Sequence, residues 1–216
     1  MKGFFSVDGT FFSVTSKIVD MALLTILWLA GCIPIVTILT STSSLYQATV
    51  KCIRYDRGKP YQEFLDAYRK NLKQGVGLTL LYGGLGAVIG YADYYIFCLM
   101  ESRTNAAFMA AVFMLIATFV YLANVVWIIP VFSRFSNTFG KILQLNFVAS
   151  IHFVIRSILM IGIVVIAVML ILSYIPLLIL FPSLTLLVLS YLSEPGLHRY
   201  MPKQEEDNGD WRYGYK

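Results

Sequence analysis

The chain has 216 residues, of which 58% are hydrophobic and only 13% are charged, and its formal net charge is +5. Its mean hydropathy is +0.71. Soluble globular proteins carry about 25% charged residues, so this chain has too few charges to cover a water-exposed surface. The composition therefore excludes a soluble enzyme, a disordered tail and a disulfide-stapled secreted domain. It predicts an all-α bundle of several membrane-spanning helices.

Stretches without Asp, Glu, Lys or Arg locate the predicted spans, because a helix needs about 20 apolar residues to cross a hydrocarbon core about 30 Å thick. These stretches cover residues 21–50, 74–92, 104–133 and 157–193. The last one is too long for one ordinary span, and Pro176 and Pro182 divide it. We therefore predict five spans, at about residues 20–40, 76–99, 107–132, 157–174 and 177–193. The alternative is four spans and a re-entrant half-helix after Pro182.

The distribution of Lys and Arg predicts the orientation, since cytoplasmic loops of membrane proteins are enriched in both. The loop after the first predicted span, the loop after the third and the C-terminal tail together hold 14 of the 17 basic residues. Only Lys2, Lys17 and Arg103 remain for the other side. We therefore expect an outside N-terminus, a cytoplasmic C-terminus and an odd number of spans. The basic residues need no nucleic acid to explain them, and they are suited to anionic lipid head groups or a partner.

Residues 1–200 are predicted to form a single transmembrane domain, and residues 201–216 a polar cytoplasmic tail. No motif for catalysis, nucleotide binding or metal binding occurs in either part. The three cysteines (Cys32, Cys52 and Cys98) are far apart, and His152 and His198 are isolated from them. We therefore expect no enzymatic activity, no cofactor and no metal site.

Two acidic residues lie in the predicted spans, where charged groups are energetically costly and often functional. Asp20 opens the first span, and Asp93 comes late in the second among several tyrosines. One interpretation is a paired or proton-linked site near the outer mouth of the bundle. The other is a pair of helix-end residues at the membrane interface, with the tyrosines forming part of an aromatic belt.

The second predicted span is rich in glycine, and Gly86 and Gly90 form a G-x-x-x-G pair, while Gly83 pairs with Ala87. Small residues at this spacing allow two membrane helices to approach closely. We therefore expect this face to pack against another helix, in the same chain or in a partner.

Two further segments are predicted to be cytoplasmic helices. The first follows a Ser/Thr-rich stretch at residues 40–46, begins near Pro60 and carries an apolar stripe within residues 60–74. The second covers about residues 137–155 and is loosely amphipathic. The second segment is either a connector lying on lipid or a docking helix for a cytoplasmic subunit, and residues 60–74 are a further candidate surface for binding other subunits.

Several motifs resemble the YesL-like family of bacterial membrane proteins. They are Asp8–Phe12, Leu27–Leu29, Ile33–Thr37, Ser44–Tyr46, Phe64–Gln74 and Phe135–Lys141. Two positions depart from the family pattern: Leu39 replaces a usual Gly, which questions a close backbone approach there, and Thr25 replaces an expected Asn.

The resemblance implies a multi-pass protein of the bacterial plasma membrane whose family is a domain of unknown function. It also implies genes that often lie beside those for carbohydrate importers of the ABC type and for polysaccharide-degrading enzymes. No established functional residues can be transferred. The motif residues are therefore candidates for structural or docking roles only, namely Pro34, Thr37, Tyr46, Phe64, Asn71 and Asn137.

These observations favour an accessory subunit of a carbohydrate uptake system, which would bind an ABC-type permease, another membrane subunit or a second copy of itself. The alternative is a small stand-alone transporter or channel, for which the spans offer only Asp20, Asp93, Asn124 and scattered hydroxyls. An intramembrane enzyme is the third and weakest interpretation, because no acid, base or metal set is recognisable.

Overall fold

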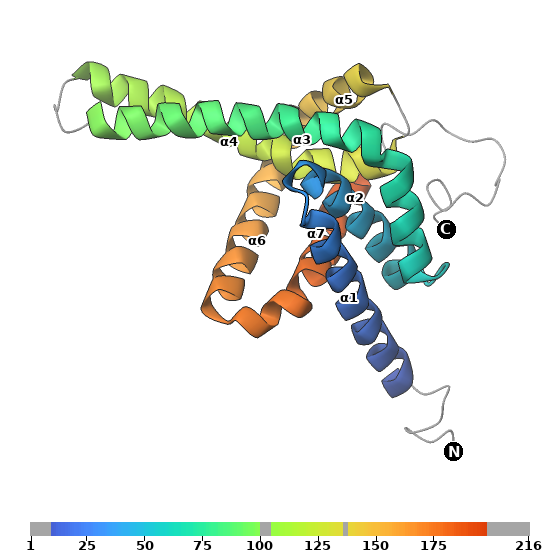
Figure 1. Ribbon diagram of the computed structural model, residues 1–216. Coiled ribbons are helices and arrows are strands. Elements are labelled where there is room, and N and C mark those ends of the chain that lie inside the picture. Colours follow the sequence, from blue (N-terminus) through green and yellow to red (C-terminus); the bar gives the residue numbers. More distant parts are fainter. Residues whose placement is uncertain (1–9, 100–104, 136–137, 198–216) are drawn as a thin grey trace.

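The computed structural model describes residues 10–99, 105–135 and 138–197, and the secondary structure of this part of the chain consists of helices, with no strand (Figure 1). Its α-helices are α1 (Thr10–Cys32), α2 (Ile38–Ala48), α3 (Pro60–Leu99), α4 (Asn105–Arg134), α5 (Phe139–His152), α6 (Val154–Ser173) and α7 (Phe181–Leu197). Shorter elements are the 3-10 helices η1 (Ile35–Thr37) and η4 (Ile175–Ile179), and the π-helix η2 (Thr49–Arg54). The predicted all-α class is confirmed, whereas the predicted tail 201–216 lies outside the described residues.

Four of these helices contain segments long and apolar enough to cross a membrane: Thr15–Cys32 within α1, and α3, α4 and α6. Their outward surfaces are largely apolar, with Val88, Phe113 and Ile166 among the most exposed side chains. This inside-out distribution is that of a helical membrane protein. The fifth predicted span corresponds to α7, which has 17 residues and contains Glu194, so the count of five stays a prediction.

The first predicted span, at residues 20–40, is wrong in its second half. α1 ends at Cys32, and Pro34 lies in the break before η1, because a proline ring disfavours helical backbone in the residue before it. Thr37 stabilises this break, since its hydroxyl donates to the carbonyl oxygens of Gly31 at 2.8 Å and Pro34 at 2.7 Å. The chain then begins the separate helix α2.

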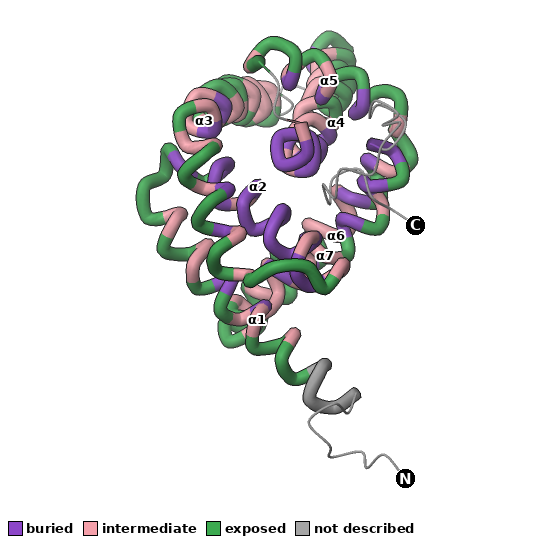
Figure 2. The backbone as a smooth tube through the Cα atoms, turned by 90° about the vertical axis from the view of Figure 1, so that its right-hand side faces the viewer, coloured by how far each residue is buried: buried purple, intermediate pink, exposed green. Residues whose placement is uncertain are grey.

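The Ser/Thr-rich stretch at residues 40–46, which the sequence placed in the connection after the first span, lies at the centre of the fold. Nine of the eleven residues of α2 are buried, and Figure 2 shows this helix surrounded by the others. A hydroxyl-rich helix can be buried because its side chains bond to backbone carbonyls. Ser44, for example, donates to Thr40 O at 2.8 Å, and Ser41 donates to Trp28 O of α1 at 2.9 Å.

α1 and α2 form a hairpin that brings the beginning of α1 back to the segment after η2. Lys17 Nζ lies 2.8 Å from Asp56 Oδ1. Groups this close cannot lie on opposite sides of a hydrocarbon core about 30 Å thick. The prediction that placed Lys17 outside and the basic loop around Asp56 inside is therefore wrong for this pair. An outside N-terminus and a cytoplasmic basic loop cannot both hold, and the side on which the two segments lie stays a prediction.

This hairpin makes a labelling prediction. Cysteines introduced at the exposed positions Ser16 and Arg57, each in a background with the three native cysteines replaced by serine, should react with a membrane-impermeant maleimide from the same side. We expect that side to be cytoplasmic, because the loop after η2 is strongly basic. Labelling of intact and inverted vesicles shows on which side each cysteine lies. Reaction of the two cysteines from opposite sides would contradict the hairpin of α1 and α2.

Of the native cysteines, Cys52 is replaced only as a precaution. Burial, together with the nearby carboxylate of Glu63, raises the pKa of the Cys52 thiol to about 12. The thiolate is the nucleophile, so Cys52 should react slowly at neutral pH. Cys98 is exposed near the end of α3, and wild-type chain should therefore be labelled there first.

α3 begins at Pro60 as predicted, but it continues without interruption to Leu99. The predicted cytoplasmic helix and the second span are thus one helix, and Figure 1 shows that it bends between its first part and its long second part. The second part pairs with α4 as a long hairpin, and Tyr121 of α4 donates to Tyr82 O of α3 at 2.9 Å.

The last helices follow the predicted boundaries, with one correction. α5 falls within the amphipathic stretch 137–155, and η4 separates α6 from α7 at the two prolines that divided the sequence. The last span was predicted to cover residues 177–193, whereas α7 begins at Phe181 and continues to Leu197, with Pro195 inside it. A proline removes one helical hydrogen bond there but leaves the last turn able to form.

Candidate functional site

α7 turns its polar residues inward, toward α1, α2 and α4. Ser183, Ser190, Ser193 and Glu194 are all buried, and their spacing places them on one face of the helix. Ser183 lies 2.7 Å from the hydroxyl of Thr25 and donates to Met21 O of α1 at 3.0 Å. Hydrogen bonds to α1 therefore hold the hydroxyl face of α7 inside the bundle.

The centre of this polar face is a buried ion pair between α4 and α7. Arg134 and Glu194 are 2% and 1% exposed. Arg134 donates through Nε to Glu194 Oε1 at 2.9 Å and through Nη2 to Oε2, so the pair is bidentate. A guanidinium matches a carboxylate in this geometry, which offsets part of the free energy needed to desolvate both charges.

Tyr46 of α2 completes the pair. Its hydroxyl donates to Glu194 Oε1 at 2.9 Å and lies 2.8 Å from Ser193 Oγ, which is left to donate to it. Burial raises the pKa of Tyr46 well above its ordinary value, and the negative charge of Glu194 acts in the same direction. The phenol therefore stays protonated and remains a donor throughout the pH range in which proteins are handled.

Arg54, at the end of η2, extends the polar layer toward the surface. Its Nη1 donates to Ser190 Oγ at 3.0 Å, and its guanidinium carbon lies 4.2 Å from the ring centroid of Tyr191. The consecutive elements α2 and η2 thus meet α4 and α7, which are far from them in the sequence, through charged and hydroxyl groups.

A second polar cluster joins α5 to the α3–α4 hairpin. Asn146 is fully buried, and its amide nitrogen donates to Tyr82 Oη at 2.7 Å and to Asn124 O at 3.0 Å. In both clusters the polar groups bond mainly to one another. Among the described residues, no group of three or more His, Cys, Asp and Glu side chains lies close enough to hold a metal ion.

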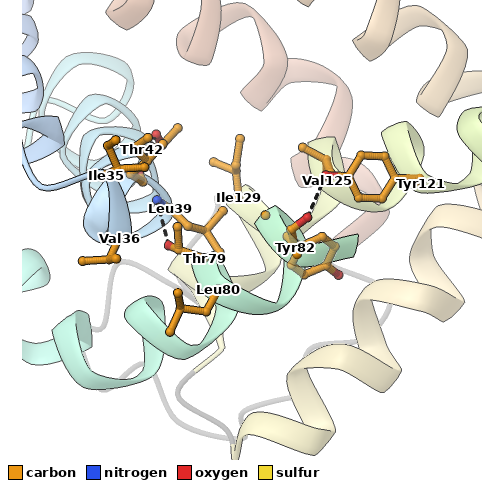
Figure 3. Close-up of a pocket in the computed structure, with 13 residues that line it drawn as sticks. Ile35, Val36, Leu39, Thr42, Thr79, Leu80, Tyr82, Tyr121, Val125 and Ile129 are labelled. Atoms are coloured by element: carbon orange, nitrogen blue, oxygen red, sulfur yellow. Dashed lines mark hydrogen bonds between the residues drawn. The ribbon is translucent and has the colours of Figure 1, made fainter. Parts of the chain in front are cut away.

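An apolar groove of about 430 Å³ is bounded by η1, α2, α3 and α4 (Figure 3). Leu39, Leu80 and Ile129 contribute to its apolar walls, and Thr79 accepts a hydrogen bond from the Leu39 backbone N–H at 3.3 Å. Gly83 and Gly84 line it without side chains. The groove therefore exposes the backbone of α3 beside apolar walls.

The structure separates the two predicted acidic residues. Asp20 is half-buried in α1, whereas Asp93 lies far along α3 and accepts a hydrogen bond from Thr118 Oγ1 at 2.8 Å. Neither residue lines the groove, and Asn124 does not line it either. The paired site considered from the sequence is therefore not formed by these two residues.

The predicted glycine face divides into two kinds of position. A Cβ at Gly86 would lie 2.3 Å from Tyr121 Oη, so Gly86 allows close packing within the chain. A Cβ at Gly83 or Gly90 would meet nothing within 4 Å. Packing inside the chain thus applies to Gly86, and the other two glycines remain open to a helix from outside.

The predicted docking residues are placed as follows. Tyr46 belongs to the buried network, and Phe64 is 2% exposed and stacks with Tyr68, so both act inside the fold. Thr37 supports the break before α2, and Pro34 is exposed within that break. Asn71 is partly exposed on α3, and Asn137 lies outside the described residues.

Sequence reasoning missed the buried ion pair. Arg134 counted only as a cytoplasmic charge, and Glu194 received no role. A signal was nevertheless present, because Ser183, Ser190 and Glu194 recur at helical spacing. In a chain with so few charges, an acid on a face of small hydroxyl residues indicates an inward-facing polar stripe.

Comparison with known proteins relates part of the chain to a protein family. No curated protein and no solved structure shows significant similarity to the chain. The family described as "Protein of unknown function, DUF624" matches residues 21–94, a segment that runs from α1 to the second part of α3. This segment contains α2, the motif residues from Leu27 to Gln74 and the glycines of the groove. Over residues 21–94 the chain therefore matches the DUF624 family, which is the YesL-like family that its motifs resemble.

Proposed function

We propose that this protein is a non-enzymatic subunit of the bacterial plasma membrane that associates with a carbohydrate uptake system of the ABC type. The observation that carries the proposal is the groove beside α3. Its walls are apolar, its glycines are uncovered, and it lies among helices with apolar outward surfaces. Such a surface suits a transmembrane helix of a permease subunit, because small residues let two helix backbones approach closely.

The polar groups support an associated subunit better than a transporter. A transport path needs polar side chains that face an aqueous cavity, whereas Arg134, Glu194 and Asn146 are buried and bonded within the chain. The groove lining is mostly apolar, and Asp93 and Asn124 are not part of it. The uptake system itself is inferred from the family resemblance, whose genes often lie beside importers of this type.

The test is a pull-down of the tagged full chain from its native membrane in a gentle detergent. Wild-type chain should recover an ABC-type permease subunit, and Gly83→Leu should reduce that recovery by at least about tenfold, because the new side chain fills the groove. Gly162→Leu is the matched control. Gly162 lies in α6, and a Cβ there also meets nothing within 4 Å, so this variant should recover the permease normally.

Three outcomes would overturn the proposal. The chain could come out alone, it could recover only a second copy of itself, or the two leucine variants could bind the permease equally well. Uptake by liposomes that contain only this chain, abolished by Asp93→Asn, would instead favour the transporter.

A further inference from the structure

Exposed cations surround the beginning of α3. They are Arg57, Lys59, Arg69, Lys70 and Lys73, which together we call the basic surface. None of them forms a salt bridge with another described residue. The nearby acids are already engaged, because Asp56 pairs with Lys17 and Glu63 pairs with Lys51. Asp66 is the remaining acid within residues 55–74, so the basic surface keeps a large positive excess.

The helix itself holds this surface next to the membrane. α3 runs from Pro60 to Leu99 without interruption, and no charged residue occurs between Lys73 and Asp93. With a rise of about 1.5 Å per residue, Lys73 lies within about one turn of the apolar part. Figures 1 and 2 both show that the first part of α3 runs in a different direction from the second. The first part therefore leaves the axis of the apolar second part directly at its charged end.

Apolar side chains on the same segment fit this placement. Tyr61 and Leu65 are 43% and 36% exposed, whereas Phe64 between them packs into the protein core. A short helical segment that exposes cations together with aromatic and aliphatic side chains is typical of a membrane interface. There the cations reach the head groups, and the apolar groups enter the boundary of the acyl chains.

We propose that the basic surface binds the phosphate groups of anionic phospholipids in the cytoplasmic leaflet. Arginine can bind a phosphate bidentately, and lysine acts as a mobile point charge, so the cluster recognises charge density more than one head group. This inference is independent of the proposed partner, since it concerns another surface of the chain. An acidic protein and the acidic C-terminal tail, which contains Glu205, Glu206 and Asp207, are the competing occupants.

The test uses purified full-length chain in mild detergent, to which phosphatidylglycerol or phosphatidylcholine is added. Bound lipid is counted by native mass spectrometry. Wild-type chain should retain the anionic lipid in preference, and this preference should fall as salt is raised from 0.1 to 0.5 M, because ions screen exposed charges. This arm needs no variant. Equal retention of the two lipids would overturn the proposal.

Variants then locate the site. Arg69→Gln/Lys70→Gln/Lys73→Gln should lower the apparent affinity for phosphatidylglycerol by at least about tenfold. Arg69→Lys/Lys70→Arg/Lys73→Arg keeps the charges and should bind like wild type, as should Lys141→Gln on α5. The triple glutamine variant binding as well as wild type would overturn the assignment. So would a large gain in lipid binding after removal of residues 203–216, because the tail would then be the natural occupant.

Discussion

Replacing Glu194 by glutamine is expected to lower the free energy of unfolding by about 3–5 kcal/mol, because it removes the carboxylate charge that the buried Arg134 guanidinium binds in a bidentate pair. Arg134 and Glu194 are almost completely enclosed, so water cannot replace the lost partner. The hydrogen bond from Tyr46 to Glu194 would also weaken, since its acceptor becomes neutral. In detergent, the apparent melting temperature should fall by on the order of 10 °C.

The matched control is Glu63→Gln. Glu63 also forms an ion pair, in this case with Lys51. Its side chain is 20% exposed, so water can solvate the lysine that remains. We expect a change of at most about 1 kcal/mol for this variant. The explanation of the buried pair would be contradicted if Glu194→Gln were no more harmful than Glu63→Gln.

A double replacement separates the cost of an unpaired charge from the value of the pair itself. Arg134→Met and Glu194→Met should each destabilise strongly, whereas the double variant should recover a large part of the loss. Full additivity of the two single effects would mean that the two side chains act independently. Because both residues join α7 to α4, the single variants should also expose α7 to proteolysis first.

The helical class could be predicted from the sequence because it depends on a simple physical quantity, the length of chain without charge. The uncharged stretches before Lys51 and after Arg103 mark where a helix can be apolar over its whole length. α3, α4 and α6 therefore lie close to their predicted positions, and the start of α3 at Pro60 follows from the preference of proline for the first turn.

The arrangement of α2 could not be predicted in the same way. Its hydroxyl residues, such as Ser41 and Ser44, suit a solvent-exposed segment as well as a buried helix. The difference lies in long-range contacts, such as that between Ser41 and Trp28, which no local pattern encodes. The same applies to the ion pair between Arg134 and Glu194, which joins residues 60 positions apart.

The glycine pattern illustrates a different limit. A G-x-x-x-G sequence shows that a close approach is possible, but it does not identify the helix that approaches. Gly86 proved to accommodate Tyr121, whereas Gly83 lies open in the groove. The closest contact of all is at Gly75, outside the motif, where α3 meets α2 at Thr40.

Among the glycine-to-alanine substitutions in α3, Gly75→Ala is expected to lower the free energy of unfolding most. A Cβ at this position would lie 2.1 Å from Thr40 Oγ1 and 2.9 Å from Thr40 Cβ, with a Phe132 ring carbon at 3.2 Å. These neighbours belong to the buried core and have little freedom to move, so α2 and α3 must separate. Overpacking of this kind costs about 1–3 kcal/mol even after the better helix propensity of alanine.

Gly83→Ala is the control on the same helix, with the opposite expected sign. A Cβ there meets nothing within 4 Å, so the variant should be neutral or more stable by up to about 1 kcal/mol. Thermal unfolding of both variants in the same detergent measures the difference. Equal melting temperatures would show that α2 and α3 are not packed as closely as described.

Thr40→Ala provides the compensating change. Thr40 Oγ1 is buried and has no hydrogen-bond partner within the described residues, so its removal alone should change stability little. Combined with Gly75→Ala, it removes the shortest contact but leaves the Cβ contact, and about half of the lost stability should return. Rescue by a substitution on α2 would tie the effect to this helix pair, because a general loss of glycine flexibility in α3 could not be repaired from another helix.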